Sequence, residues 1–210
     1  MDYEEYWRRR GFQISDKLKD RENIFLDWIP AGRRVLDVGC GNSRLPLVLK
    51  EKGCSVQVAD LSKLVLDGYR EHGISGQQVD LDSIADWVPP SGIFDYVILS
   101  EVLEHTRNPE EIIAKLKPLA RHLVLSVPNS AFYRYRLSLL FRGRFFTQWA
   151  FHPSEHLRFW SHLDFLDWLR AMGLTVEKTA ASNGFGGPVK NWWPNLFGNS
   201  MCYLARTENV

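Results

Sequence analysis

The chain has 210 residues, of which 45% are hydrophobic and 24% are charged, and its formal net charge is +1. Such a composition is that of a folded globular protein, and the near-neutral charge gives no reason to expect nucleic acid as a partner. The length suits one α/β domain with a full core, and no apolar run reaches the roughly 18 residues expected of a transmembrane helix.

The start of the chain, MDYEEYWRRRGF, is charged and aromatic with no apolar run behind it. It does not have the form of a signal peptide, and the three cysteines lack metal-site spacing. We therefore expect a cytoplasmic protein with reduced thiols. Helical spacing of apolar residues over 2–29 ends at Pro30, so residues 1–30 are predicted to form a helical lead-in to a domain spanning 1–210.

Strands and helices alternate over the next hundred residues. An apolar strand over 35–38 runs into a glycine turn with the sequence DVGCG at 37–41, and Ser43 is a candidate N-cap for the helix that follows. The further elements expected to residue 128 are helices over 43–52, 62–69, 84–87 and 108–117, and strands over 54–59, 74–79, 94–99 and 122–127. This alternation is typical of a parallel, doubly wound sheet.

The last third of the chain departs from that alternation. Residues 129–160 form an inserted aromatic and basic cap without clean periodicity, and Ser161 then begins a helix. Strands over 174–178 and 201–206 follow, joined by the loop 182–199 without a helix, which favours an antiparallel edge pair. We predict a three-layer α/β/α fold around a mostly parallel seven-stranded sheet with an antiparallel last strand.

Acidic or polar residues follow the ends of successive strands, at Asp37, Asp60, Asp80, Ser100 and Glu101. In an open α/β sheet this rim is where a ligand lies, and Asp60 has the position of a carboxylate that accepts from ribose hydroxyls. A dinucleotide site would add a third glycine to the turn at 37–41, and the sequence has none there.

These motifs together resemble those of class I S-adenosylmethionine-dependent methyltransferases, in the methyltransferase type 11 or MetW-like branch. The matching stretches are DVGCG at 37–41, Asp60, VDLD at 79–82 and FDYVILSEVLEH at 94–105. The resemblance implies a Rossmann-like fold, S-adenosylmethionine as donor and S-adenosylhomocysteine as product. It also implies donor contacts, with Asp37 at the amino group, Asp60 at the ribose and Asp80 at the adenine. The implied cofactor residues are Asp37, Gly39, Cys40, Gly41, Asp60, Leu61, Asp80, Leu81 and Ser100.

Glu101, Glu104 and His105 follow the fourth strand at spacings i, i+3 and i+4, so one helical turn would place them on one face. We predict them as catalytic, with His105 as the general base, because imidazole titrates near neutral pH. The same side chains would suit Mg²⁺ or Mn²⁺, with His152 or His156 completing the shell. In a third, structural interpretation the acids favour a helix N-terminus and His105 only packs.

The cap carries arginines between aromatic rings. Such a pattern would bind nucleic acid, a membrane surface, an acidic or aromatic substrate or a partner protein, or would simply pack on the sheet. The near-neutral net charge favours a packed cap or a pocket, closed on the same side by Trp192, Trp193 and Phe197. The residues concerned are Phe132, Tyr133, Arg134, Tyr135, Arg136, Phe141, Arg142, Arg144, Phe145, Phe146 and Trp149.

A closer resemblance is to the MetW family of methionine biosynthesis, through FDYVILS, RNPEE, NSAFYRYRLSLLFRGR and WWPNLF. It implies a methyltransferase fold that acts as a non-catalytic partner or activator of homoserine O-acyltransferase. The stretch EVLEH at 101–105 departs from the uncharged stretch expected there, and HLRFW at 156–160 is similar to active methyltransferases. We therefore expect an enzyme that methylates O or N of a small-molecule or lipid-like acceptor, with the partner role as the alternative.

Overall fold

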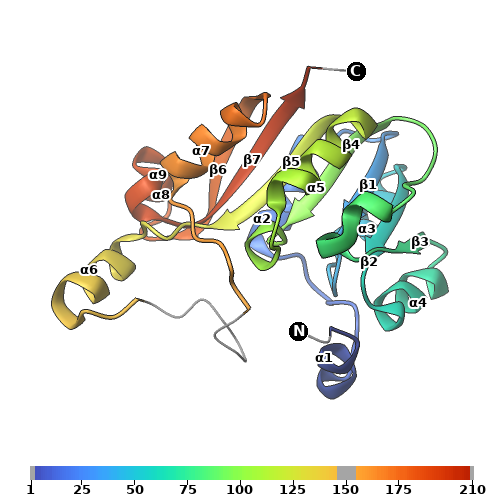
Figure 1. The fold of residues 1–210 in the computed structure, drawn as a ribbon, viewed down its shortest axis with the longest axis horizontal. Helices are drawn as coiled ribbons and strands as arrows, with labels where there is room; N and C mark the ends of the chain where they lie inside the picture. Colours follow the sequence, from blue (N-terminus) through green and yellow to red (C-terminus); the bar gives the residue numbers. More distant parts are fainter. Residues whose placement is uncertain (1–2, 146–154, 209–210) are drawn as a thin grey trace.

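A computed structural model describes residues 3–145 and 155–208 of the chain (Figure 1). Its centre is a seven-stranded sheet in the order β3-β2-β1-β4-β5-β7-β6. All neighbouring strands pair in parallel except β7, which is antiparallel to both β5 and β6. The strands are β1 (Arg34–Val38), β2 (Ser55–Asp60), β3 (Ser75–Gln78), β4 (Phe94–Ser100), β5 (Ala120–Pro128), β6 (Leu174–Gly184) and β7 (Gly198–Thr207).

Helices cover both faces of this sheet. One buried cluster joins α2, α3 and α4 to the sheet, and a second cluster joins α5 and α7 to its other face. Neighbouring strand residues alternate between the clusters, with Val35 in one and Leu36 in the other. The helices are α1 (Tyr3–Arg10), α2 (Asp20–Trp28), α3 (Leu45–Glu51), α4 (Lys63–Glu71), α5 (Pro109–Leu116), α6 (Tyr133–Arg142), α7 (His162–Ala171), α8 (Val189–Trp192) and α9 (Pro194–Phe197). The predicted three-layer, doubly wound fold is confirmed.

The strand order reverses between β1 and β4, which are neighbours although β2 and β3 lie between them in sequence. At such a switch point the loops leaving the two strands diverge and open a crevice at their carboxyl ends. The glycine turn follows β1, and Glu101 directly follows β4. The predicted motifs therefore meet at the crevice because of the topology alone.

Several local predictions were correct in place but wrong in detail. The lead-in is two helices rather than one, because Gly11 takes a left-handed φ of 64° after α1. Ser43 lies one residue before the N-cap Arg44, although its hydroxyl still accepts from the Leu45 amide. The short helix near Ile84 is a 3₁₀ segment, Leu81–Asp86.

The edge strands are longer than their apolar runs. β6 continues to Gly184 and β7 begins at Gly198, so the predicted loop 182–199 shrinks to a connection carrying α8 and α9. The two strands pair with each other beyond their apolar runs, and register shifts accommodate the irregular positions. The residue pattern alone did not predict this extension. In the part of the chain that the structure describes, no helix is long and apolar enough to span a bilayer.

Candidate functional site

The glycine turn after β1 is held in a conformation that other residues rarely adopt. Gly39 and Gly41 have φ of 72° and 50°, and the Gly39 amide donates to the Ala59 carbonyl at 2.7 Å. A Cβ on Gly39 would lie 2.6 Å from Cγ2 of Val102, just after β4. The turn thus passes directly beside the segment that follows β4, and both positions require glycine.

Asp60, at the end of β2, fastens this turn from the other side. One of its carboxylate oxygens accepts from the Gly41 amide at 2.9 Å, and the other accepts from the Ser62 amide at 3.0 Å. The Cys40 thiol also donates to it, at 3.8 Å. Burial raises the pKa of Asp60, while these backbone amides oppose the shift. Asp60 therefore joins β1, β2 and the start of α4 into one rigid rim.

Asp37 is buried at the base of the same turn, and its Oδ1 has no hydrogen-bond partner within the described chain. Burial, reinforced by the negative charges of Glu22 and Asp60, raises the pKa of Asp37 to about 8. A buried carboxylate oxygen without a donor is rare in folded proteins. Its geometry fits a cationic ligand group placed against the turn.

Asp80 and Leu81 continue the rim beyond β3. The Val79 amide donates to the Asp60 carbonyl at 3.0 Å, so Asp80 follows directly on the neighbouring strand. The Asp80 side chain is exposed, and it accepts from the Asp82 amide at 3.0 Å. The predicted cofactor residues on β1, β2 and β3 are therefore brought to one edge of the sheet.

Arg21 on α2 is a site residue that the sequence did not reveal. Its Nε donates to Ser100 Oγ at 2.9 Å, and its guanidinium lies 3.1 Å from Oε2 of Glu101. The side chain is only 14% exposed, so a full positive charge sits at the end of β4. In the sequence Arg21 is one polar residue on an amphipathic helix, and no spacing links it to a strand end almost eighty residues later.

Helix α1 lies over the glycine turn, a placement that composition could not predict. Glu4 accepts from the Ser62 hydroxyl at 2.6 Å, at the start of α4. A Cβ on Gly41 would lie 3.2 Å from the ring of Trp7. Burial, followed by negative charges of which Glu155 is the largest, raises the pKa of Tyr3 to about 12. The lead-in therefore covers the rim.

Glu101 does not share a helical turn with Glu104 and His105, so that prediction is wrong. Glu101 has a left-handed φ of 54°, and the 3₁₀ segment begins only at Leu103. Its carboxylate turns instead to Arg21 and accepts from the Ser200 hydroxyl at 2.8 Å. A strained backbone at a non-glycine residue separates the predicted trio into two groups.

The second group joins Glu104 and His105 to His156, whose candidate ligand atoms all lie within 4.8 Å of one another. His105 Nδ1 is 2.7 Å from the Glu155 carbonyl, which only accepts, so Nδ1 carries the proton and Nε2 is the basic nitrogen. Burial lowers the pKa of His105, which keeps the ring neutral. His152, the other predicted candidate ligand, lies outside the described residues, as do Phe146 and Trp149 of the predicted cap.

Glu104 is the least satisfied residue of this group. Both carboxylate oxygens are buried and lack a hydrogen-bond partner in the described chain. Burial, with the charge of Glu101, raises its pKa well above the ordinary value. Burial and the neighbouring His105 lower the pKa of His156 to about 4. A buried carboxyl beside two neutral imidazoles fits either a protonated acid or a divalent cation.

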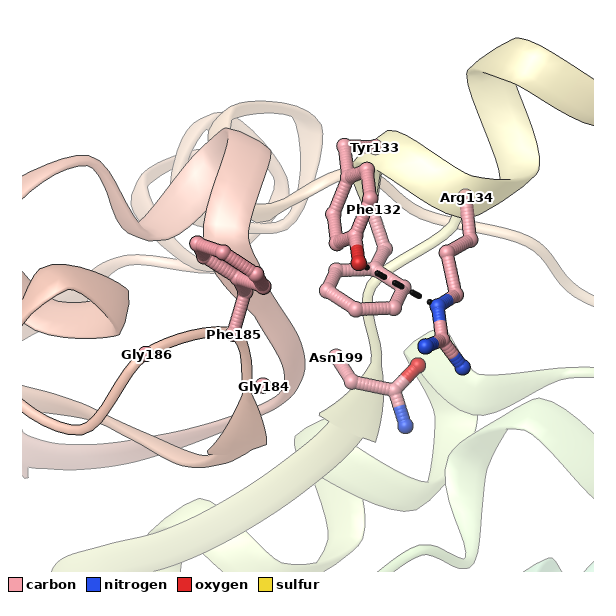
Figure 2. Close-up of a pocket in the computed structure, with 7 residues that line it drawn as sticks. All are labelled: Phe132, Tyr133, Arg134, Gly184, Phe185, Gly186 and Asn199. Carbon is pink, nitrogen blue, oxygen red and sulfur yellow. Dashed lines mark hydrogen bonds between the residues drawn. The ribbon is translucent and has the colours of Figure 1, made fainter.

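A pocket of about 270 Å³ lies beyond Glu101, where the loops after β5 and β6 meet (Figure 2). Figure 2 shows Phe185 facing Phe132 and Tyr133 across it, with the Arg134 guanidinium near Asn199. Arg134 Nε donates to the Tyr133 hydroxyl at 3.2 Å. Asn199 directly precedes Ser200, the hydrogen-bond partner of Glu101. One step along β7, from Asn199 to Ser200, therefore links the pocket lining to the partner of Glu101.

Comparison with known proteins places the chain among methyltransferase relatives. The family model described as "Methionine biosynthesis protein MetW" matches residues 19–205. A curated relative, the ubiquinone biosynthesis O-methyltransferase of Dechloromonas aromatica, is 32% identical over 213 residues, covering 90% of this chain and 86% of that protein. The bifunctional methionine biosynthesis protein MetXA/MetW of Rhodopirellula baltica is 28% identical over 179 residues, covering 76% of this chain but 27% of that protein.

A solved structure has the same fold. It is the magnesium protoporphyrin IX methyltransferase of Synechocystis with bound S-adenosylhomocysteine, which superposes with a TM-score of 0.63 at 19% identity. The superposition covers 97% of this chain and 94% of that one. At this identity the likeness concerns the fold, which agrees with the order of the strands.

The close approach at Gly39 leads to a stability prediction. Gly39→Ala should lower the free energy of unfolding by about 1–3 kcal/mol more than Gly53→Ala. Both glycines have positive φ, but a Cβ on Gly53 meets nothing within 4 Å. Urea unfolding of the two variants measures the difference. Equal losses would mean that Val102 moves aside without cost.

The raised pKa of Asp37 leads to a pH prediction. The folded chain holds its proton up to about pH 8, whereas the unfolded chain releases it near pH 4. Wild-type stability therefore falls as the pH rises through this window. Asp37→Asn should remove that slope, so its stability relative to wild type should increase between about pH 5 and 8 by up to about 1.4 kcal/mol per pH unit.

Urea unfolding at several pH values measures this increase, and Asp67→Asn, which removes an exposed carboxylate of α4, is the control. A difference between Asp37→Asn and wild type that does not change with pH would show that Asp37 ionises normally.

Proposed function

Since the chain belongs to the MetW family and is a class I S-adenosylmethionine-dependent methyltransferase, we propose that it binds the donor at the rim of β1, β2 and β3 and methylates an oxygen atom of an aromatic, lipid-like acceptor. The observation that carries the donor site is the unpartnered Oδ1 of Asp37 beneath the glycine turn. A positively charged methionine group would supply the donors that this oxygen lacks.

Each part of the donor would have a partner along the rim. Asp37 would hold the ammonium group of the methionine portion, and the guanidinium of Arg21 would donate to its carboxylate. Asp60 would accept from the ribose hydroxyls, because its oxygens keep further lone pairs after accepting from two backbone amides. Leu61 and the segment at Asp80 and Leu81, beyond β3, would hold the adenine.

Methyl transfer is an in-line displacement, so alignment supplies most of the catalysis. The acceptor oxygen forms a bond to the methyl carbon while the carbon–sulfur bond breaks, and neutral S-adenosylhomocysteine leaves. The proton of the acceptor hydroxyl passes to Nε2 of His105, the unprotonated ring nitrogen. Glu101 contributes by holding Arg21, and Ser100 shares the same guanidinium.

A divalent cation is a second candidate for the same corner. Glu104, His105 and His156 would hold Mg²⁺ or Mn²⁺, and the supporting observation is that both Glu104 oxygens lack partners. Such an ion would lower the pKa of a bound hydroxyl and orient it toward the methyl group. In that case His105 acts as a ligand rather than as a base.

The acceptor class rests on the pocket and on the relatives. The pocket offers aromatic faces for a ring, and Arg134 and Asn199 for its polar substituents (Figure 2). The D. aromatica relative is named as an O-methyltransferase of ubiquinone biosynthesis. These two observations favour oxygen over nitrogen, and a substituted ring over an aliphatic acceptor.

The second candidate function is a partner role in methionine biosynthesis. It is supported by the family match over residues 19–205 and by the R. baltica relative, which is named as a bifunctional methionine biosynthesis protein MetXA/MetW. In this role the chain would bind an acyltransferase and S-adenosylmethionine without transferring the methyl group.

Donor binding is tested by titrating S-adenosylhomocysteine in a calorimeter. Wild type should bind it, and Arg21→Gln should weaken binding by about 10-fold or more, because a hydrogen bond to a charged group contributes roughly 1.5–3 kcal/mol. Arg70→Gln, at an exposed ion pair on α4, is the matched control and should bind normally. Undiminished affinity in Arg21→Gln would remove Arg21 from the donor site.

Catalysis is tested with catechol as a small phenolic acceptor and methyl-labelled donor. His105→Gln should reduce kcat by about 100-fold or more while S-adenosylhomocysteine affinity is retained. His122→Gln, at a half-buried position of β5 beside Glu177, is the control. Activity that survives a strong chelator would contradict the cation hypothesis.

Unchanged turnover in His105→Gln would contradict the base. Donor binding without transfer to catechol or to larger phenols, together with capture of a homoserine acyltransferase, would favour the partner role.

A further inference from the structure

Helix α6 presents its apolar stripe to solvent instead of to the core. Leu137, Leu140 and Phe141 are spaced i, i+3 and i+4, so they form one continuous stripe. Their exposed fractions are 46%, 72% and 77%. An amphipathic helix on a globular protein normally buries such a stripe. The apolar side of α6 therefore faces away from the core, where an amphipathic helix would normally place it. An exposed apolar surface of this kind is typical of an interaction site.

Contacts on the opposite side explain this orientation. Phe132 is buried before the helix begins, the Tyr135 hydroxyl donates to Asn199 at 2.6 Å, and the Arg136 guanidinium donates to the Asn195 carbonyl at 3.1 Å. These bonds fix the first turns of α6, and every residue from 139 to 145 is exposed. Figure 1 shows α6 extending away from the sheet at the lower left.

A second apolar patch lies at the same end of the molecule. Phe185, Trp192 and Trp193, in the connection between β6 and β7, are 51%, 80% and 51% exposed. The ring of Tyr133 on α6 lies 5.5 Å from that of Phe185, so the two patches adjoin. Tryptophan is enriched where proteins meet the interface of a bilayer, because its ring is amphipathic.

The part of the sequence that contains α6 carries basic residues and no acidic ones. Residues 112–154 contain no Asp or Glu. Arg142 and Arg144 are exposed at the end of α6, and neither forms an ion pair with a carboxylate of the described chain. A net charge of +1 for the whole chain conceals this local excess.

We propose that α6 and the connection carrying Phe185, Trp192 and Trp193 dock the protein onto an anionic lipid surface. The apolar stripe and the indole rings enter the interface between headgroups and acyl chains, while the arginines bind lipid phosphates. Aliphatic side chains at the centre of the stripe fit this occupant better than nucleic acid, which is bound by charge and aromatic stacking. The unpaired positive charge favours an anionic bilayer over a neutral apolar partner.

The pocket described above lies beside the two patches, since its lining includes Tyr133, from the same helix as the stripe, and Phe185, from the second patch (Figure 2). On a docked protein the pocket therefore faces the bilayer. A lipid-like acceptor would reach it directly from the membrane, an extension that rests on the proposed function. Docking itself does not depend on methyl transfer.

Flotation with lipid vesicles tests the docking. The full chain should float with phosphatidylcholine vesicles containing about 30% phosphatidylglycerol, and much less with phosphatidylcholine alone. Binding should weaken between about 50 mM and about 500 mM NaCl, because salt screens the arginines. The double variants Leu140→Ser/Phe141→Ser and Arg142→Gln/Arg144→Gln should each lower partitioning by about 10-fold or more.

A matched control removes the same kinds of groups elsewhere. Val88→Ser/Arg70→Gln changes one exposed apolar and one exposed basic side chain away from α6, and should float like wild type. S-adenosylhomocysteine affinity should be unchanged in every variant, which shows that they fold and keeps this test separate from the donor site. Absence of flotation by wild type, or equal flotation by all variants, would overturn the proposal. A protein partner captured through the stripe by a chain that does not float would overturn it as well.

Discussion

The carboxylate of Asp60 is the interaction on which the rest of the site depends. By accepting from the Gly41 and Ser62 amides it ties the turn after β1 to the start of α4. Glu4 binds the hydroxyl of the same Ser62, so the helix above the rim is anchored at the same point. Backbone amides that donate to one carboxylate hold the turn and the start of α4 in a fixed position and stabilise the charge of Asp60. The glycines provide the close approach and Asp60 keeps it in place.

The second constraint is the number of carboxyl groups buried behind that edge. Glu22, Asp37 and Glu104 are all nearly inaccessible to solvent. Burying charged groups without partners is costly, and the raised pKa values of Asp37 and Glu104 are the consequence. Arg21 offsets part of this at the end of β4. A bound sulfonium donor with its ammonium group would offset more, so ligand binding and the ionisation of Asp37 should be linked.

The sequence was sufficient to predict the features that follow from its alternation of strands and helices. Strand ends, the turn at 37–41 and Asp60 follow from hydrophobic pattern and spacing, since parallel strands deliver their carboxyl ends to one edge. Contacts between elements that are distant in the chain produce no such spacing or hydrophobic pattern in the sequence. Arg21 reaches β4 only because α2 crosses the sheet face, and Glu101 left its expected turn because of one positive φ angle. Neither a long-range ion pair nor a single backbone torsion has a local sequence signature.

The orientation of helix α6 in the cap also depends on contacts between distant elements, which the sequence does not reveal. The residues of the cap show no clean periodicity, so the sequence predicted neither helix α6 within the cap nor which side of that helix would face the sheet. Hydrogen bonds from Tyr135 and Arg136 to the residues at 195–199 decide that question, and they turn Leu140 and Phe141 outward. The orientation of α6 thus depends on polar contacts on one side and leaves the apolar side for another partner. Because Tyr133 belongs to both α6 and the pocket, whatever covers the stripe also stands at the entrance for the acceptor.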